Sequence, residues 1–169
     1  MKRALVALAF VFAFALSPAL SYAELQIGAV GMYNGDIAAL GSQPLDMTWG
    51  MESRLKFLKV LQVGLTGLYY TASVVGGSSY IFALADAGLS VDIFFLRFGV
   101  GMGPNLLIPM SGPSVDATSN ANLKLSGDVT IGPVAIGVIA FYPFPSIWDV
   151  RNVSRTKPWI GLTAMLKLF

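Results

Sequence analysis

The feature that most constrains this chain is a two-residue alternation on both sides of Phe94-Phe95. Apolar side chains hold every second position, at Leu89, Val91, Ile93, Leu96, Phe98, Val100 and Met102. The other positions are polar or glycine, at Asp86, Gly88, Ser90, Asp92, Arg97, Gly99, Gly101 and Gly103. Because successive side chains of a strand point to opposite faces, this pattern predicts two strands joined by a two-residue hairpin turn. Aromatic residues are unusual at such a turn and favour an amphipathic setting such as a membrane interface.

The same alternation recurs along the chain and predicts eight strands. They span residues 24–33, 48–57, 60–71, 80–93, 96–105, 122–131, 134–142 and 158–169. Long and short connections follow one another in turn, and the longest predicted loop covers 106–121. Strands of about 9 to 14 residues are long enough to cross a bilayer when tilted. The sequence therefore predicts an all-β fold: a membrane-spanning, eight-stranded antiparallel up-and-down β-barrel with short periplasmic turns and longer extracellular loops.

The first 23 residues have the composition of a cleavable signal peptide. Lys2-Arg3 precede an apolar run over 4–16, and Ser21-Tyr22-Ala23 provides small residues for cleavage. Residues 24–169 would then form the barrel. Without Lys2 and Arg3, nine of the 11 basic residues remain, and they match the nine acidic residues. This balanced charge gives no indication of a nucleic-acid partner, and the 55% hydrophobic content favours lipid instead.

Two other classes of fold compete with a membrane-spanning barrel. A soluble barrel would turn its polar faces to water, but those faces carry only about eight charges in total. Tyrosine and tryptophan also gather near the long loops, and several phenylalanines gather near the short turns, as in the two aromatic belts of membrane barrels. A membrane helix over 129–148 would be uncharged, but it would contain three prolines. Strands joined by a turn account for those prolines.

The signal peptide, the eight alternating strands, the four long loops and the terminal Phe169 together resemble the small outer-membrane barrels of the OmpA, OmpX and OmpW kinds. The resemblance covers residues 24–169 and implies the bacterial outer membrane, with both termini periplasmic and with lipid and lipopolysaccharide as neighbours. It also implies that the barrel-assembly machinery recognises the last strand through Phe169 and through apolar residues two, four and six positions earlier. Here these positions hold Lys167, Met165 and Thr163, and the opposite face, from Ile160 to Leu168, is more apolar.

If the apolar faces point outward, charged side chains point into the lumen. We expect them to form ion pairs, because an unpaired buried charge is costly. The predicted lumen ion pairs involve Glu52, Arg54, Lys56, Asp86, Asp92, Arg97, Lys124 and Asp128. One hypothesis is a barrel plugged by these pairs, which would act as a surface-exposed adhesin or as a structural outer-membrane protein through its loops. The segment 149–157, with three basic residues, is a candidate for such contacts.

A second set of inward residues is apolar and lies toward the long loops. This predicted vestibule contains Val30, Met32, Leu68, Tyr70, Phe82, Leu84, Ile139 and Phe141. An apolar vestibule above a polar floor suits a small hydrophobic molecule. The resemblance to OmpW-type barrels implies binding and passive uptake of such compounds.

Catalysis is not indicated by this sequence. The chain contains no histidine and no cysteine, so it offers no Ser-His pair and no imidazole or thiolate ligand for a metal. Glu52 and Asp86 could be considered as an acid/base pair, but Arg54 and Arg97 on the same face favour ion pairing instead. We therefore expect no catalytic residues, no cofactor and no metal.

Overall fold

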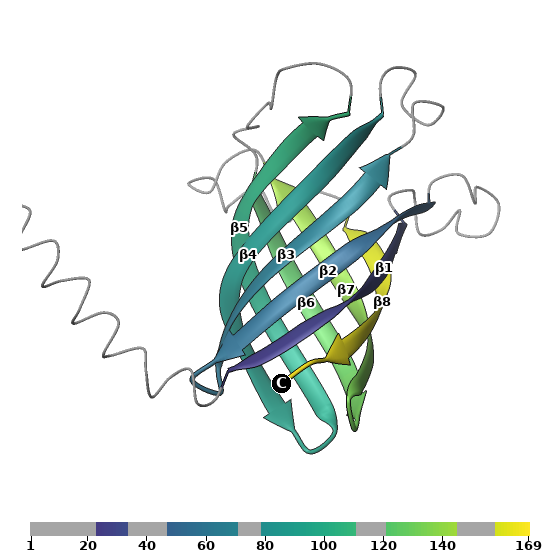
Figure 1. Ribbon diagram of the computed structural model, residues 1–169. Helices are drawn as coiled ribbons and strands as arrows, with labels where there is room; N and C mark the ends of the chain where they lie inside the picture. Colours follow the sequence, from purple (N-terminus) through teal and green to yellow (C-terminus); the bar gives the residue numbers. More distant parts are fainter. Residues whose placement is uncertain (1–22, 34–46, 71–78, 111–120, 145–157) are drawn as a thin grey trace, which may run out of the picture.

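The computed structural model describes residues 23–33, 47–70, 79–110, 121–144 and 158–169. These residues form eight strands that close into one barrel in the order β1 to β8, with antiparallel neighbours throughout (Figure 1). The strands are β1 (Glu24–Tyr33), β2 (Met47–Phe57), β3 (Leu61–Tyr70), β4 (Tyr80–Ile93), β5 (Leu96–Pro109), β6 (Ala121–Ile131), β7 (Val134–Phe144) and β8 (Trp159–Lys167). The predicted eight-stranded up-and-down barrel is confirmed. The predicted signal peptide falls on residues outside the described ranges, apart from Ala23.

The barrel closes where the first strand meets the last. On β1, Ala29 pairs with Met51 of β2 on one side and with Ala164 of β8 on the other. A closed sheet leaves no unpaired strand edge. Three short turns join β2 to β3, β4 to β5 and β6 to β7 at one end, called here the turn end; the opposite end is the loop end.

Strand β5 is longer than the alternation predicts. The expected loop at 106–109 is wrong, because these residues continue the ladder with β4, from Ala83 opposite Leu106 to Tyr80 opposite Pro109. The run Leu106-Leu107-Ile108 does not alternate in polarity, because at this level the lumen is apolar as well. Inward-facing Leu107 packs against buried hydrophobic residues.

A proline interrupts β5 halfway along the strand. The β4–β5 register is the same on both sides of it, with Leu84 opposite Asn105 and Ala87 opposite Met102. In an antiparallel ladder, every second pair of opposite residues is hydrogen-bonded, and counting from the Ile93–Leu96 pair at the turn makes Ala85 and residue 104 such a pair. The Ala85 carbonyl should therefore accept a hydrogen bond from the amide of residue 104, but Pro104 has no N–H. The side-chain amide of Asn122 on β6 donates to the Ala85 carbonyl at 3.1 Å instead, and also to the Gly103 carbonyl at 3.1 Å.

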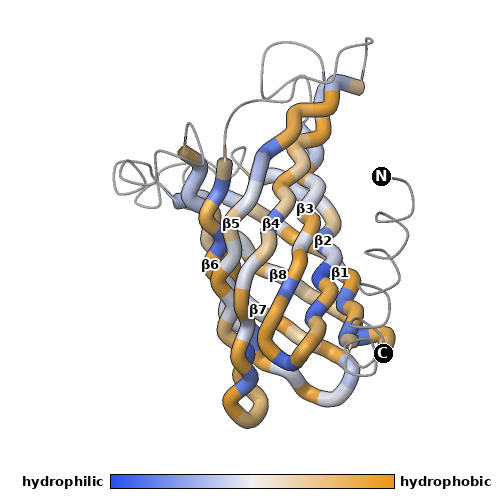
Figure 2. Tube along the Cα trace, turned by 90° about the vertical axis from the view of Figure 1, so that its left-hand side faces the viewer, coloured by the Kyte–Doolittle hydropathy of each residue, from blue (hydrophilic) through white to orange (hydrophobic). Residues whose placement is uncertain are grey.

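Hydrophobic and hydrophilic residues alternate along the strands (Figure 2), and large hydrophobic side chains are exposed on the outer wall. Leu65, Val91 and Leu162 are each exposed by half or more of their surface. On β8 the exposed side chains come from the face that contains Ile160 and Leu166, whereas Thr163 and Met165 are buried. Of the three positions that the resemblance expects to be apolar before Phe169, Thr163 and Met165 point into the barrel, and Lys167 stands at its rim. Among the described residues, no helix has the length and apolar character needed to span a membrane.

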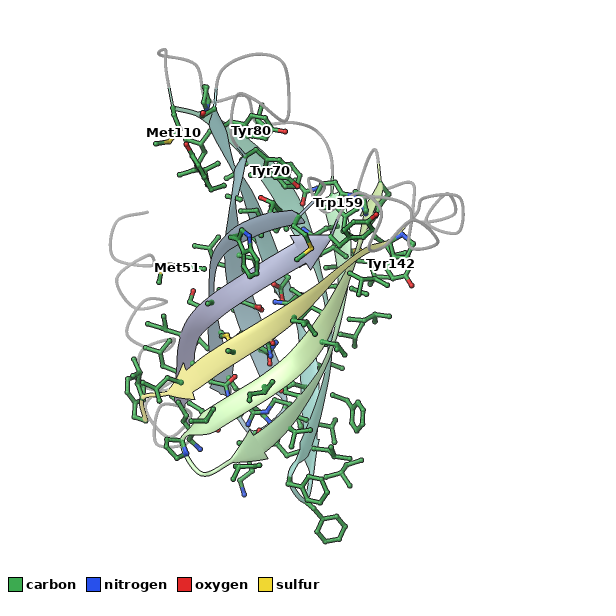
Figure 3. All side chains as sticks on the ribbon, turned by 90° about the vertical axis from the view of Figure 1, so that its right-hand side faces the viewer. Met51, Tyr70, Tyr80, Met110, Tyr142 and Trp159 are labelled. Carbon is green, nitrogen blue, oxygen red and sulfur yellow. The ribbon has the colours of Figure 1, made fainter. Side chains whose placement is uncertain are left out.

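The aromatic residues at the two ends are arranged differently. At the turn end, Phe94, Phe95 and Phe98 are exposed, and Phe94 is exposed by 98%. At the loop end, Trp49 faces outward, but Tyr70, Tyr80 and Trp159 turn into the lumen (Figure 3). The loop-end aromatics expected to form an outer belt are thus divided between the two faces of the wall.

Two of the short turns carry different residues at the same position. In the β6–β7 turn, Gly132 has φ = 60°, which glycine adopts without strain. In the β4–β5 turn, Phe94 has φ = 57° at the corresponding place, where a side chain is strained by about 1 kcal/mol or more. The backbone at position 94 therefore favours glycine, and Phe94 is present despite this preference.

Candidate functional site in the barrel interior

The loop-end half of the lumen is filled by an apolar cluster. Its members are Val30, Met32, Leu68, Tyr70, Phe82, Leu84, Ile139 and Phe141, each with at most 9% of its surface exposed. These are the eight residues of the predicted vestibule, and the structure brings them all together. Tyr80, Leu107 and Trp159 pack against the cluster.

Aromatic contacts shape the two ends of the apolar cluster. Toward the loop end, the rings of Tyr70 and Tyr80 stack with centroids 5.0 Å apart. The Phe82 ring lies 5.4 Å from that of Trp159. Deeper in the lumen, the Lys124 ammonium lies 5.6 Å from the centre of the Phe141 ring, a cation–π contact. Lys124 thus marks the boundary at which the apolar interior becomes ionic.

Below that boundary lies a row of five charged side chains, called here the buried ionic chain. In order of contact they are Asp86, Lys124, Glu52, Arg54 and Asp128. Lys124 Nζ lies 3.1 Å from Asp86 Oδ2 and also binds Glu52. Arg54 binds Glu52 at 2.7 Å through Nε and Asp128 at 2.5 Å through Nη1. All five side chains are at most 2% exposed, and three carboxylates share two cations, so the net charge is −1.

A second row, the rim ionic chain, lies at the turn end. It runs through Lys167, Glu24, Arg97, Asp92 and Lys56. The contacts along it measure 2.8, 2.5, 2.6 and 2.7 Å in that order. Asp92 and Lys167 have 46% and 40% of their side chains exposed. Here three cations share two carboxylates, so the order of signs is reversed and the net charge is +1.

Inward glycines allow the buried carboxylates to lie flat against the wall. A Cβ atom at Gly64 would lie 2.4 Å from Asp86 Oδ2, and one at Gly101 would lie 2.8 Å from Asp86 Oδ1. A Cβ at Gly137 would lie 2.1 Å from Asp128 Oδ1. These three glycines are therefore notches that hold carboxylates beside the backbone, and they do not widen the lumen.

The two ionic chains contain all eight charged residues predicted to line the lumen. They also include Glu24 and Lys167, which the sequence interpretation missed. Both stand at strand ends, on the same faces as the buried residues Gln26 and Met165. Extending the two-residue alternation to the first and last residues of the strands would have found them.

Comparisons of the chain with protein-family models, with curated proteins and with solved structures gave no match. Within the described ranges, no three acidic side chains are arranged so that they could hold a metal ion. The fold and the interior define a small, closed, eight-stranded barrel with many exposed apolar side chains and with buried ion pairs.

Proposed function

We propose that residues 24–169 span the bacterial outer membrane as a β-barrel after removal of the signal peptide 1–23. The short turns and both termini would be periplasmic, and the long loops would be extracellular. The apolar outer wall supports this proposal, because burying one large aliphatic side chain is worth about 1.5–3 kcal/mol. A water-facing wall would leave many such side chains exposed, whereas hydrocarbon would cover them.

The chain lacks cysteine, so single cysteines can carry spin labels without interference. Labels at Leu65, Leu125 and Leu162 should be accessible to oxygen in bilayers and protected from water-soluble relaxation agents. A label at buried Ser90 serves as the inward control. If the outer labels report water around a barrel reconstituted in lipid vesicles, the membrane proposal is wrong.

Within this barrel, we propose that the loop-end half of the lumen binds small hydrophobic molecules and supports their passive uptake. The observation that carries the proposal is the separation of the lumen into an apolar cluster at the loop end and ionic chains beneath it. A small hydrophobic ligand could enter and leave the apolar cluster without breaking ion pairs or burying polar groups. The ionic chains would oppose free flow of ions, because their charged side chains occupy the lumen and already bind one another.

Binding can be tested with the refolded barrel and a medium-chain fatty acid, by calorimetry. A ligand must displace side chains of the apolar cluster, so Val30→Phe and Leu84→Phe, which overpack it, should weaken binding. Leu125→Phe on the outer wall is the matched control. Leu68→Asp should reduce uptake into vesicles if the folded barrel is recovered. Equal affinities for the wild type, the cluster variants and the outer-wall control would contradict the proposal.

The second candidate function is display of the loops by an adhesin or a structural protein of the outer membrane, with lipopolysaccharide as a neighbour. The ionic chains favour it, because they join β1, β2, β4, β5, β6 and β8 across the lumen. The basic segment 149–157 lies outside the described residues. Exchanging this segment for a neutral one and measuring cell attachment would test display, while planar-bilayer recordings should show no stable conductance.

We propose that the barrel-assembly machinery engages the end of β8. Phe169 is 63% exposed beyond the end of that strand, and its carbonyl accepts a hydrogen bond from the Leu25 amide at 3.1 Å. Phe169→Ala should slow assembly in cells and leave refolding into pure lipid unchanged. Leu168→Ala is the neighbouring control.

A further inference from the structure

The outer wall is not uniformly convex. A groove of about 540 Å³ crosses the seam at which β1 meets β8 and extends over β2 and β7. Its outward side chains include Trp49, Ile136, Leu162 and the small residues Ala29 and Ala164. This groove is distinct from the lumen, because the barrel wall lies between them.

The register explains why the wall is hollowed at this place. Ala29 and Ala164 lie directly opposite each other across the seam, and Gly31 follows two positions later on β1. Larger side chains surround these small ones: Trp49 on β2, Ile136 on β7, which is the partner of Ala164, and Ile160 and Leu162 on β8. Ala29, Gly31 and Ala164 therefore form a floor, and the larger side chains of β2, β7 and β8 form raised edges.

Trp49 forms one edge of the groove and depends on Gly31. The two residues are partners across β1 and β2, and a Cβ atom at Gly31 would lie only 2.6 Å from Trp49 Cζ3. The indole therefore lies flat over the glycine, with 65% of the residue exposed. Aromatic side chains that cover a glycine on a neighbouring strand stabilise a sheet locally, and here the arrangement leaves one face of the indole available to a ligand.

We propose that this groove binds one hydrocarbon chain of a membrane lipid. The proposal rests on the membrane-spanning function proposed above, and it assigns a defined lipid position to one part of the wall. The lining side chains that face outward carry no charge, and Thr163 turns inward, with its hydroxyl 3.4 Å from Asp128 Oδ1. A lipid chain is flexible and narrow enough to reach the floor formed by Ala29 and Ala164. The broad wall of a second barrel would instead rest on the raised edges.

The main experiment measures lipid retained by the detergent-purified barrel, using native mass spectrometry after addition of phosphatidylglycerol or of lipid A. Ala164→Leu fills the floor and should lower retention about tenfold, the factor expected when roughly two methylene groups lose their contacts. Ala87→Leu is the matched control, because Ala87 is also exposed on the outer wall but lies on β4. The two added lipids show whether the hydrocarbon chain comes from a phospholipid or from lipopolysaccharide.

A second measurement uses Trp49 as its own reporter, after Trp148 and Trp159 are changed to phenylalanine. Lipids brominated on the chain should quench Trp49 strongly, and Gly31→Ala should reduce quenching by displacing the indole. Gly67→Ala is the control, because a Cβ there would meet only Ile81 Cγ2, at 3.8 Å.

The outcomes separate the groove proposal from the membrane proposal. If Ala164→Leu and Ala87→Leu retain equal amounts of lipid, or if the wild type forms a dimer that Ala164→Leu abolishes, the lipid site is wrong. If labels at Leu65 and Leu125, which do not line the groove, also fail to report hydrocarbon, the membrane proposal fails as well. Lipid contact at those labels together with unchanged retention in Ala164→Leu would overturn the groove proposal alone.

Discussion

The buried and rim ionic chains have five charged side chains each, in opposite order of sign. The buried chain begins and ends with aspartates, Asp86 and Asp128, whereas the rim chain begins and ends with lysines, Lys167 and Lys56. The Lys167 side chain is 40% exposed and can extend its ammonium group to water, whereas Lys56 is buried and binds Asp92, which is 46% exposed. The short aspartate side chains remain against the wall, beside glycines. The comparison teaches that the ionic chain with surplus positive charge reaches water through Lys167 and Asp92, whereas the ionic chain with surplus negative charge is enclosed along its whole length.

The difference in exposure should make the two chains unequal in free energy. Removing one partner of a buried ion pair costs about 3–5 kcal/mol, because the remaining charge is left uncompensated. An exposed ion pair contributes about 0–1 kcal/mol, because water and salt replace the lost partner. The buried ionic chain should therefore control the free energy of unfolding, and the rim ionic chain should make it depend on salt.

The largest effect is expected for Glu52→Gln. Glu52 is the central member of the buried ionic chain and binds both Lys124 and Arg54. Its neutralisation should lower the free energy of unfolding by about 3–5 kcal/mol, measured by urea titration in lipid vesicles. A loss below about 1 kcal/mol would show that the two ionic chains contribute equally.

A smaller effect is expected for Gly64→Ala. The added methyl group would lie 2.4 Å from Asp86 Oδ2 and must push this carboxylate away from Lys124. We expect a loss of about 1–3 kcal/mol, the usual cost of overpacking an interior. Gly67→Ala, on the outer face of the same strand, should cost much less, and equal losses for the two variants would contradict a role for the notch.

At the rim, Asp92→Asn should have a still smaller effect. Asp92 binds Lys56 and Arg97, but its side chain is 46% exposed. The expected loss is about 0.2–1 kcal/mol at low salt. Repeating the unfolding titration in about 1 M salt should bring the variant and the wild type together, because the screening length then falls to about 3 Å. If the loss in free energy of unfolding persists at high salt, Asp92 contributes to stability in the same way as the members of the buried ionic chain.

The smallest effect is expected for Asp86→Asn, even though Asp86 is almost fully buried. This change removes the surplus negative charge and leaves Glu52 and Asp128 to balance Lys124 and Arg54. The amide oxygen of asparagine can still accept a hydrogen bond from Lys124. We expect a change within about 0.5 kcal/mol. A loss as large as that of Glu52→Gln would show that the count of charges along the buried ionic chain does not determine its stability.

Alternation along single strands was sufficient to predict much of this molecule. It indicated the eight strands, the inward position of residues such as Arg54 and Leu68, and the exposed position of Leu125. It missed the last residues of β5, because Leu106 to Ile108 are apolar on both faces. It does not assign Glu24 and Lys167 to the lumen, because both stand at strand ends, where a charged side chain can also reach water.

Contacts between distant strands could not be predicted in this way. Arg54 and Asp128 are 74 positions apart, and they meet because of the tilt and stagger of a closed sheet. The covering of Gly31 by Trp49 depends on the register of β1 and β2, which the sequence pattern does not state. The substitution of the Asn122 amide for the missing Pro104 N–H is another such contact between strands.

The Asn122 amide has a consequence for the order in which the barrel assembles. The β4–β5 hairpin alone leaves the Ala85 carbonyl without a donor, because the donor belongs to the next strand along the chain. Hydrocarbon offers no water as a substitute, and an unsatisfied backbone group there costs several kcal/mol. In the membrane setting proposed above, this hairpin would gain by inserting together with β6, and the smallest independently inserting unit in this part of the chain would be three strands.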